Sequence, residues 1–180
     1  NGIKLDFVER YINKPWDWYN GLSENKAITM DFIERHLDKP WNWSDQGLSL
    51  NPNITMDFVE KHMDKPWLFG CENGGGNKYH VYFGLSLNHR LTQDFIEKYI
   101  DKPWNWGSFG LSSRFDITAE FIESHLDKPW LWGSPGGLST NSSIPLPLVE
   151  SNLDKPWDWS DTGFSKYFGR SIYPRIIFKN

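Results

Sequence analysis

The chain has 180 residues, with 19 Lys or Arg and 23 Asp or Glu, which gives a formal net charge of −4 and a calculated isoelectric point of about 5.7. This balance argues against a nucleic-acid-binding protein, which presents a basic face, and no apolar run approaches the ~20 residues of a membrane span. The single cysteine, Cys71, excludes an internal disulfide and a cysteine-rich zinc site.

Eleven tryptophans are the unusual feature of the composition, and their spacing predicts the architecture. All of them lie in Pro-Trp-x-Trp blocks, with Phe69 replacing the second Trp of the third block, and successive blocks are 25, 26, 37, 26 and 27 residues apart. A period of this size is typical of a solenoid, a propeller or an array. We therefore expect one repeat domain over residues 1–180, built from six repeats of ~26 residues. The repeats are 3–27, 28–53, 54–90, 91–116, 117–143 and 144–165, and residues 166–180 form a C-terminal cap or tail.

The first half of each repeat predicts a short helix, as residues 28–39 illustrate. Thr29 is a good N-cap because its hydroxyl can accept hydrogen bonds from the free amides of the first turn, and Asp31 suits the positive end of the helix dipole. Pro40 should end the helix, since the residue before a proline avoids the α region. The same threonine recurs at Thr55, Thr92 and Thr118.

The apolar residues of this segment predict one buried helix face. Ile28 and Ile33 have the N′ and N4 spacing of a hydrophobic staple. Side chains at i, i+1, i+4 and i+5 lie on one side of a helix. The residues expected on that side are Phe32, Ile33, His36 and Leu37.

The second half of each repeat gives a weaker signal. Proline is favoured at the first helical position, so Pro40 indicates a second, very short helix or 3₁₀ turn. A glycine such as Gly47 precedes each Leu-Ser or Phe-Ser pair, which suggests a backbone position with positive φ. No period-2 alternation occurs inside the repeats, so strands and a propeller are disfavoured. The sequence therefore predicts an all-α fold, a helical-repeat solenoid.

The tryptophans are expected to form the core of this solenoid. One helix of this length is unstable alone, whereas stacked repeats bury their apolar faces as a continuous core, and each Trp or Phe can bury roughly 150–250 Å². The alternative is an aromatic platform for a ligand, although such aromatics are usually few and local. The expected core positions are Trp16, Trp18, Trp41, Trp43, Trp67, Phe69, Trp104, Trp106, Trp130, Trp132, Trp157 and Trp159.

The second and third repeats carry a pattern that resembles a known family. Residues 51–55 are Asn-Pro-Asn-Ile-Thr and residues 64–67 are Asp-Lys-Pro-Trp, while residues 38–43 are Asp-Lys-Pro-Trp-Asn-Trp, with Leu-Ser at 48–49. The pattern resembles the tryptophan-rich repeat proteins encoded by giant DNA viruses of amoebae, over nearly the whole chain. The resemblance implies a virus-encoded scaffold, such as a virion component, in the virion or the host-cell cytoplasm, and no catalytic residue. The chain departs from the pattern at Pro145 and Pro147, in its long third repeat and in the glycine before each Leu-Ser.

The residues that could carry chemistry recur with the repeat, which favours structural roles. His36, His62 and His125 share one helix position, and stacked helices lie roughly 8–10 Å apart, too far for a shared zinc ion with ligands at about 2 Å. The aspartate of Asp-Lys-Pro-Trp recurs in five repeats and is expected to be a cap or turn residue. No phosphate loop, nucleophile motif or zinc-protease motif is present. We therefore expect no enzyme activity, cofactor, metal or small-molecule substrate.

Two segments fall outside the period. The third repeat carries an insertion over residues 70–83, with a glycine run at 74–76 and a strand-like stretch at 79–83. Insertions in solenoids become loops on one face, often the binding face; a neutral loop expansion is the alternative. The tail at 166–180 is apolar and basic, and it caps the last repeat or docks into a partner. The candidate binding residues are Tyr79, His80, Tyr82 and Phe83.

The function favoured by these observations is a non-catalytic scaffold that binds another protein, a capsid or virion protein under the viral resemblance, or assembles with itself. The alternative is a glycan-binding module that uses exposed tryptophans. A third hypothesis is an enzyme that works in the insertion through Cys71 and His80, which no orienting acid motif accompanies. Residues 1–3 begin in the register of residues 53–54, so we also expect further repeats upstream.

Overall fold

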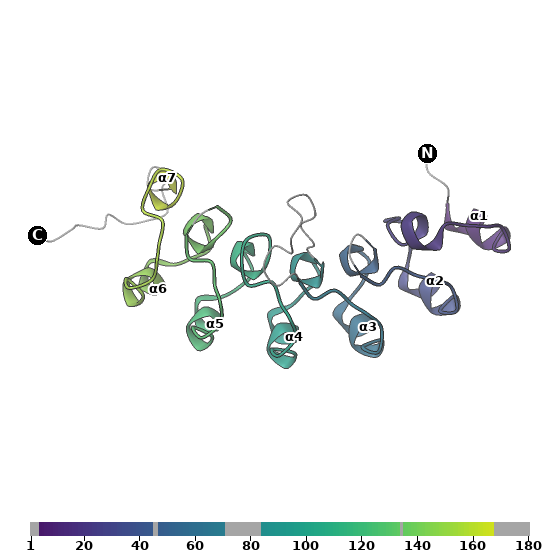
Figure 1. The fold of residues 1–180 in the computed structure, drawn as a ribbon, viewed down its shortest axis with the longest axis horizontal. Helices are drawn as coiled ribbons and strands as arrows, with labels where there is room; N and C mark the ends of the chain where they lie inside the picture. The colour runs from purple at the N-terminus through teal and green to yellow at the C-terminus, as the bar shows by residue number, and fades with distance from the viewer. Residues whose placement is uncertain (1–3, 45–46, 71–83, 134, 168–180) are drawn as a thin grey trace, which may run out of the picture. The chain divides into compact units, whose positions relative to one another are not determined.

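A computed structural model describes residues 4–44, 47–70, 84–133 and 135–167 of the chain (Figure 1). The chain divides into two compact units, an N-terminal unit (Asn1–Trp104) and a C-terminal unit (Asn105–Asn180), and each is described by itself. The described residues form helices and no strands, so the all-α prediction is confirmed for them. None of the helices in these residues is long and apolar enough to cross a membrane.

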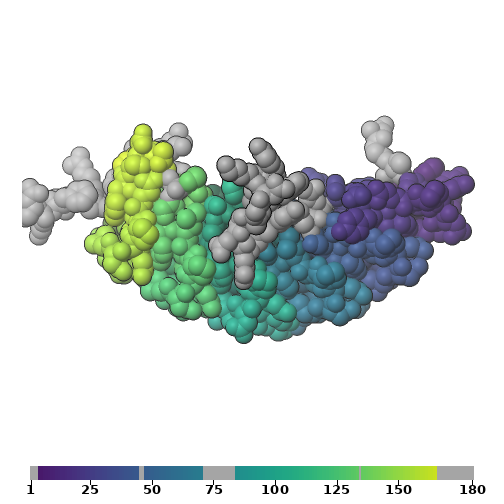
Figure 2. Space-filling view, in the orientation of Figure 1, coloured from purple at the N-terminus to yellow at the C-terminus, as the bar shows by residue number. Residues whose placement is uncertain are grey.

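Six-residue α-helices alternate with shorter helices along the chain. In the N-terminal unit, α2, α3 and α4 follow one another along one side and the short η helices lie along the other (Figure 1). Side chains fill the space between successive segments of this unit (Figure 2). The N-terminal unit contains α1 (Leu5–Arg10), η1 (Trp18–Leu22), α2 (Met30–Arg35), η2 (Leu48–Leu50), α3 (Met56–Lys61), η3 (Gly84–Leu87) and α4 (Gln93–Lys98). The C-terminal unit contains η4 (Leu111–Ser113), α5 (Ala119–Ser124), η5 (Leu138–Thr140), α6 (Leu146–Ser151) and α7 (Phe164–Tyr167).

The predicted threonine N-caps are confirmed. The Thr29 hydroxyl accepts a hydrogen bond from the Phe32 amide at 3.3 Å, in extended backbone just before α2. This bond satisfies one of the four amides that a helix start leaves free. On α6, Pro145 stands at the same position and makes no such bond. The equivalent caps are Thr55 for α3, Thr92 for α4 and Thr118 for α5.

The helices end earlier than predicted. α2 ends at Arg35, so Pro40 does not terminate it. The His36 carbonyl that follows accepts hydrogen bonds from the Lys39 amide at 3.1 Å and from Trp41 Nε1 at 2.9 Å. Because the indole satisfies this carbonyl, the chain can leave the helix before the proline is reached. The same indole bond joins Trp16 to Tyr11, Trp67 to His62, Trp104 to Tyr99, Trp130 to His125 and Trp157 to Asn152.

The early end of the helix changes which residues are buried. Ile28, Phe32 and Ile33 are buried as predicted. Leu37 was predicted to share their face but is 37% exposed, because it follows the last helical turn and does not continue the stripe. Helices α3 to α6 also each bury two adjacent apolar residues: Phe58 and Val59, Phe95 and Ile96, Phe121 and Ile122, and Leu148 and Val149.

A second short helix exists in most repeats, but it does not begin at the proline. In the second repeat it is the 3₁₀ helix η2, which starts at Leu48 and lies eight residues after Pro40. Its first amide donates to the Asn42 carbonyl at 2.8 Å. The segment that leads into η2 therefore folds back onto the Pro-Trp-x-Trp block of its own repeat.

The glycine before Leu-Ser allows a close backbone approach, and the prediction of positive φ is wrong for most of these positions. Gly47 has φ −96° and Gly110 has φ −141°, whereas Gly84 alone among the described Leu-Ser glycines has positive φ, at 50°. A Cβ at Gly47 would lie 2.2 Å from the Asn42 carbonyl oxygen. A side chain at this position would therefore push apart the two backbone segments that the hydrogen bond from the Leu48 amide to the Asn42 carbonyl joins. The same clash would occur at Gly84 with Leu68, at Gly110 with Asn105 and at Gly163 with Asp158.

Candidate functional site

The second tryptophan of one repeat packs into an aromatic slot on the next helix. We define the aromatic slot of a helix as its Phe, or Leu148 on α6, together with the Lys and the first Trp that follow the helix. In the slot of α2, Trp18 stacks on Phe32 at 6.2 Å and 15° and meets the edge of Trp41 at 5.1 Å and 86°. The Lys39 ammonium lies 5.8 Å from the centre of the Trp18 ring, which adds a cation–π contact.

The aromatic slot recurs in both units with nearly the same geometry. Trp43 in the slot of α3 stacks on Phe58 at 6.5 Å, and Trp106 in the slot of α5 stacks on Phe121 at 6.5 Å. Phe69 in the slot of α4 meets Trp104 at 5.1 Å and 86°, the same values as in the slot of α2. The insertion at 70–83 therefore leaves this contact unchanged. Ring-to-ring contacts in the other slots join Trp43 to Trp67, Trp106 to Trp130 and Trp132 to Trp157.

A buried serine joins the slots of α2, α3, α5 and α6 to the repeat before each of them. Ser23 Oγ donates to the Trp18 carbonyl at 2.7 Å and accepts from the Asn42 amide at 2.9 Å. Ser23 is fully buried, and these two hydrogen bonds satisfy its hydroxyl. Ser49, Ser112 and Ser139 make the same pair of hydrogen bonds, to the amides of Leu68, Leu131 and Asp158.

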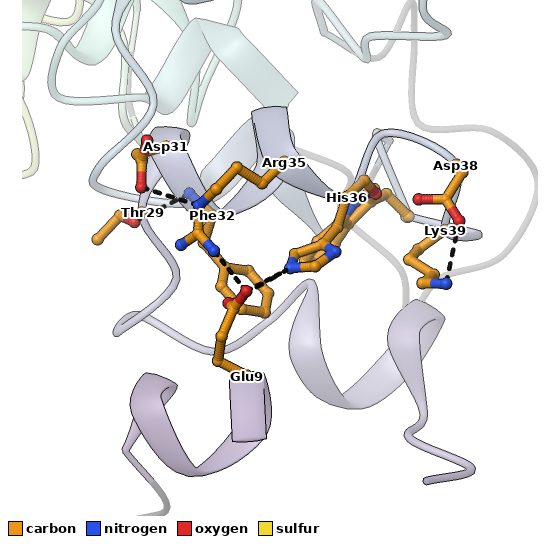
Figure 3. Close-up of polar contacts among 9 residues, drawn as sticks. Glu9, Thr29, Asp31, Phe32, Arg35, His36, Asp38 and Lys39 are labelled. Atoms are coloured by element: carbon orange, nitrogen blue, oxygen red, sulfur yellow. Dashed lines mark hydrogen bonds and ion pairs between the residues drawn. The ribbon is translucent and has the colours of Figure 1, made fainter. Parts of the chain in front are cut away.

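Glutamates of the N-terminal unit bridge to basic residues on the next helix. Figure 3 shows Glu9 of α1 between Arg35 and His36, and the Glu9 carboxylate lies 3.2 Å from His36 Nε2. Burial acts to raise the pKa of Glu9, but the hydrogen bonds from Arg35 and His36 outweigh it, so the net pKa lies below the ordinary value. The same carboxylate raises the pKa of Arg35 through its hydrogen bond.

The bridge recurs along this unit. Glu34 lies 2.6 Å from Lys61 Nζ and 2.9 Å from His62 Nε2, and these hydrogen bonds, that of Lys61 first, lower the Glu34 pKa. Glu60 pairs with Lys98, whose hydrogen bond lowers the Glu60 pKa. These exposed pairs add modestly to stability.

Helix α1 carries an aromatic slot that is open. The ring centroids of Phe7 and Trp16 lie 6.3 Å apart at 85°, against 6.2 Å and 83° for Phe32 and Trp41 in the filled slot of α2. Phe7 is nevertheless 47% exposed, whereas Phe32 is 1% exposed. A hollow of about 360 Å³ lies at this end of the N-terminal unit. It is lined by Phe7, Tyr11, Lys14, Pro15 and Trp16.

Most of the tryptophans named from the sequence are buried. Trp41, Trp104 and Trp130, the first tryptophans of three repeats, are 3–5% exposed. Trp16 is half-buried and Trp159 is 44% exposed, so the exceptions lie in the first and last repeats. The remaining buried positions are Trp18, Trp43, Trp67, Phe69, Trp106, Trp132 and Trp157.

The candidate binding residues Tyr79, His80, Tyr82 and Phe83 lie outside the described residues, as do Cys71 and most of the tail. His36 and His62 face glutamates, and His125 lies 2.9 Å from the Phe121 carbonyl. Within the described ranges, no group of three or more His, Cys, Asp or Glu side chains could hold a metal ion.

Sequence reasoning missed the glutamate bridges and the open slot. The signal for the bridges was a glutamate at the fifth position of one helix, such as Glu9, and a basic residue at the sixth position of the next helix, such as Arg35. Both positions are visible in the sequence, but their contact depends on the helix spacing. Comparison of the chain with family models, curated proteins and solved structures gave no match.

Proposed function

We propose that this chain is a non-catalytic scaffold, a helical solenoid of six repeats that presents surfaces to a protein partner or to further copies of itself. The observation that carries the proposal is the use of the second tryptophans. In both units the second tryptophans that are followed by a further slot helix, Trp18, Trp43, Trp106 and Trp132, fill the aromatic slot of that helix and are buried. Their large apolar area is therefore used for packing between repeats.

Several contacts support a solenoid. Slots, serine bridges and indole-to-carbonyl bonds recur at matched positions of both units. The slots and the serine bridges join a repeat to its neighbour, which is how a repeat protein distributes its stability, and the indole-to-carbonyl bonds fix the same turn within a repeat. The solenoid would be a stack of nearly equivalent layers, with recognition carried by whatever departs from the common pattern.

The alternative of a glycan-binding module needs exposed tryptophans. Trp159, at 44% exposure, is the most accessible tryptophan in the described part of the chain. One accessible indole near a chain end offers little of the extended platform that sugar stacking requires. The burial of the others therefore favours the scaffold.

The viral resemblance narrows the partner of the proposed scaffold to a capsid or other virion protein. Recognition by the insertion at 70–83 is part of this proposal, because its aromatic residues are not required by the repeat pattern, and aromatics are enriched at interface hot spots. The residues at the core positions, in contrast, already cap helices or pack between repeats.

Affinity capture with the full chain as bait, from virions or infected cells of the resembling viruses, tests this function. Replacing Tyr79, His80, Tyr82 and Phe83 by serine should abolish capture of the partner while leaving the melting temperature unchanged. The matched control replaces Phe109 and Phe115, which are 55% and 68% exposed, by serine and should capture normally. A glycan array tests the competing function. If the chain binds a glycan and Trp159→Ala removes that binding, the glycan-binding module would replace the scaffold as the proposed function.

A further inference from the structure

We propose that Met30 is a site of reversible oxidation by hydroperoxides, and that its sulfoxide weakens the joint between α2 and α3. The proposal goes beyond the scaffold function and does not depend on it, because it concerns how firmly two helices are joined. It rests on a side-chain contact between the first residue of α2 and the residue that caps α3.

The sulfur of Met30 takes part in the cap of the next helix. Thr55 Oγ1 donates a hydrogen bond to Met30 Sδ at 3.3 Å. The same hydroxyl accepts a hydrogen bond from the Phe58 amide, also at 3.3 Å. Thr55 is half-buried, whereas the equivalent cap threonines of α2, α4 and α5 are exposed. One hydroxyl therefore links the first residue of α2 to the first turn of α3.

The start of α3 is held against the start of α2 by further hydrogen bonds. The Asn53 side chain donates to the Lys26 carbonyl at 2.9 Å and to the Ile28 carbonyl at 2.7 Å. These bonds join the segment that precedes α3 to the segment that precedes α2. A larger group between Met30 and Thr55 would therefore have to fit into a joint whose two sides are already tied together.

Met30 combines this contact with access to solvent. It is half-buried, so a small hydroperoxide can reach its sulfur. Met56 occupies the same position on α3 and is 7% exposed. Met63 lies two residues after the end of α3 and is half-buried. Met56 is thus the matched control for access, because it differs from Met30 in burial and shares its place at a helix start.

The oxidation is a transfer of one oxygen atom. The thioether sulfur attacks an oxygen of the hydroperoxide, the O–O bond breaks, and an S–O bond forms. The sulfur is oxidised by two electrons, and the peroxide is reduced to water or an alcohol, which keeps the proton of the transferred oxygen. A methionine sulfoxide reductase reverses the step: two thiols are oxidised to a disulfide, and the oxygen leaves as water.

The sulfoxide does not fit the cap as the thioether does. A thioether is an apolar group and a weak acceptor, whereas the sulfoxide is polar and chiral. An oxygen added on the side of Thr55 would occupy the place of the hydrogen bond. An oxygen added on the outer side would leave a partly positive sulfur facing the Thr55 hydroxyl. Either product requires this hydroxyl to turn, which weakens its bond from the Phe58 amide and hence the cap of α3.

Peroxide treatment of a chain with a single oxidisable sulfur tests the proposal. The full chain with Met56→Leu, Met63→Leu and Cys71→Ser keeps Met30 as its one Met or Cys residue. Hydrogen peroxide should add one oxygen atom and lower the melting temperature by about 2–4 °C, the effect of weakening one cap in a chain of this size. Methionine sulfoxide reductase with dithiothreitol should restore both values. Adding Met30→Leu to this background gives the control, which should not respond.

Variants of Thr55 show whether the effect passes through the cap. In the same background, Thr55→Val removes the hydroxyl and should reduce the shift on oxidation to less than half, whereas Thr55→Ser keeps the hydroxyl and should keep the shift. In the parent, peptide mapping should find Met30 oxidised on the order of 10-fold faster than Met56. Equal rates at Met30 and Met56, an unchanged melting temperature, or a full shift in Thr55→Val would each overturn the proposal. The scaffold function would survive, since capture of a partner is measured separately.

Discussion

Helices α3 and α6 follow the same sequence pattern but are joined to the preceding helix in different ways. α3 receives Trp43 in its aromatic slot and also binds Glu34 through Lys61 and His62. The sequence of α6 contains no basic residue. In the slot of α6, the ring centres of Trp132 and Trp157 lie 4.9 Å apart. The Asn152 side chain donates a hydrogen bond to the Leu148 carbonyl of its own helix at 2.9 Å.

The difference shows that the slot is the common means of joining helices and that the glutamate bridge is an addition. Rings in contact exclude water and bury large apolar areas, whereas an exposed ion pair gains little over its hydration. In the C-terminal unit, slots and serine bridges join the described part of one repeat to the next. The N-terminal unit adds charge pairs whose strength depends on pH and salt.

The largest expected effect is loss of a first tryptophan, and it should be equal in the two units. Trp67→Ala and Trp130→Ala each remove a buried ring and an indole-to-carbonyl bond, and each should lower the free energy of unfolding by about 3–5 kcal/mol. Urea denaturation followed by circular dichroism measures this. Trp159→Ala, at an exposed ring, serves as the control; a loss as large as that of Trp67→Ala would contradict the role assigned to the slots.

An added methyl group at the close backbone approach should have the next largest effect. Gly47→Ala and Gly110→Ala place Cβ 2.1–2.2 Å from a carbonyl oxygen, and each should cost about 1–3 kcal/mol as an overpacked site. Gly107→Ala is the matched control, because its nearest contact would be an ordinary 3.5 Å. Equal melting temperatures for all three variants would show that the two backbone segments can move apart without loss of stability.

The bridges should matter less, and only in the N-terminal unit. Glu34→Gln removes the charge pair with Lys61 and should lower the free energy of unfolding by less than about 1 kcal/mol, an effect that salt reduces. Glu123→Gln on α5 is the matched control and should change nothing, since α6 offers no basic residue to Glu123. Equal effects of both substitutions at low salt would remove the distinction between the two units.

Acid should weaken the bridges selectively. The pKa of Glu9 and that of Glu34 are lowered in the folded chain, so their stabilising contribution is complete above the unfolded value of about 4.5 and is lost as the pH falls through the lower folded values. The double variant Glu9→Gln, Glu34→Gln should therefore lose less stability than the parent between pH 6 and pH 3, compared by urea midpoints. A parallel decline in both proteins would argue against the bridges as the source.

The helix caps could be predicted from the sequence, and the contacts that only the folded chain brings together could not. Thr29 caps α2 because cap and amide are three residues apart. The end of α2 at Arg35 was missed because the Trp41 indole satisfies the free carbonyl of His36, five residues before it. The purpose of Gly47 was missed because its constraint is a carbonyl that only the folded turn brings near.

The candidate site follows the same division. Recurrence of the tryptophans suggested burial, but it did not say that Trp18 of one repeat would lie in the slot of the next. Glu9 and Arg35 are 26 residues apart, and their contact depends on the stacking of α1 and α2. The six-repeat solenoid, the viral resemblance and the partner stay predictions.

The serine bridge has a consequence for how such a gene can change length. Every described bridge joins residues 19 positions apart, Ser23 to Asn42 or Ser112 to Leu131, and so spans less than one period of the chain while crossing from one repeat to the next. An in-frame duplication of one whole period, with its breakpoints anywhere in that period, adds one complete set of contacts and disturbs none of the old ones. Unequal recombination can thus lengthen or shorten the array in whole steps, whereas a partial duplication would leave a buried hydroxyl without its amide.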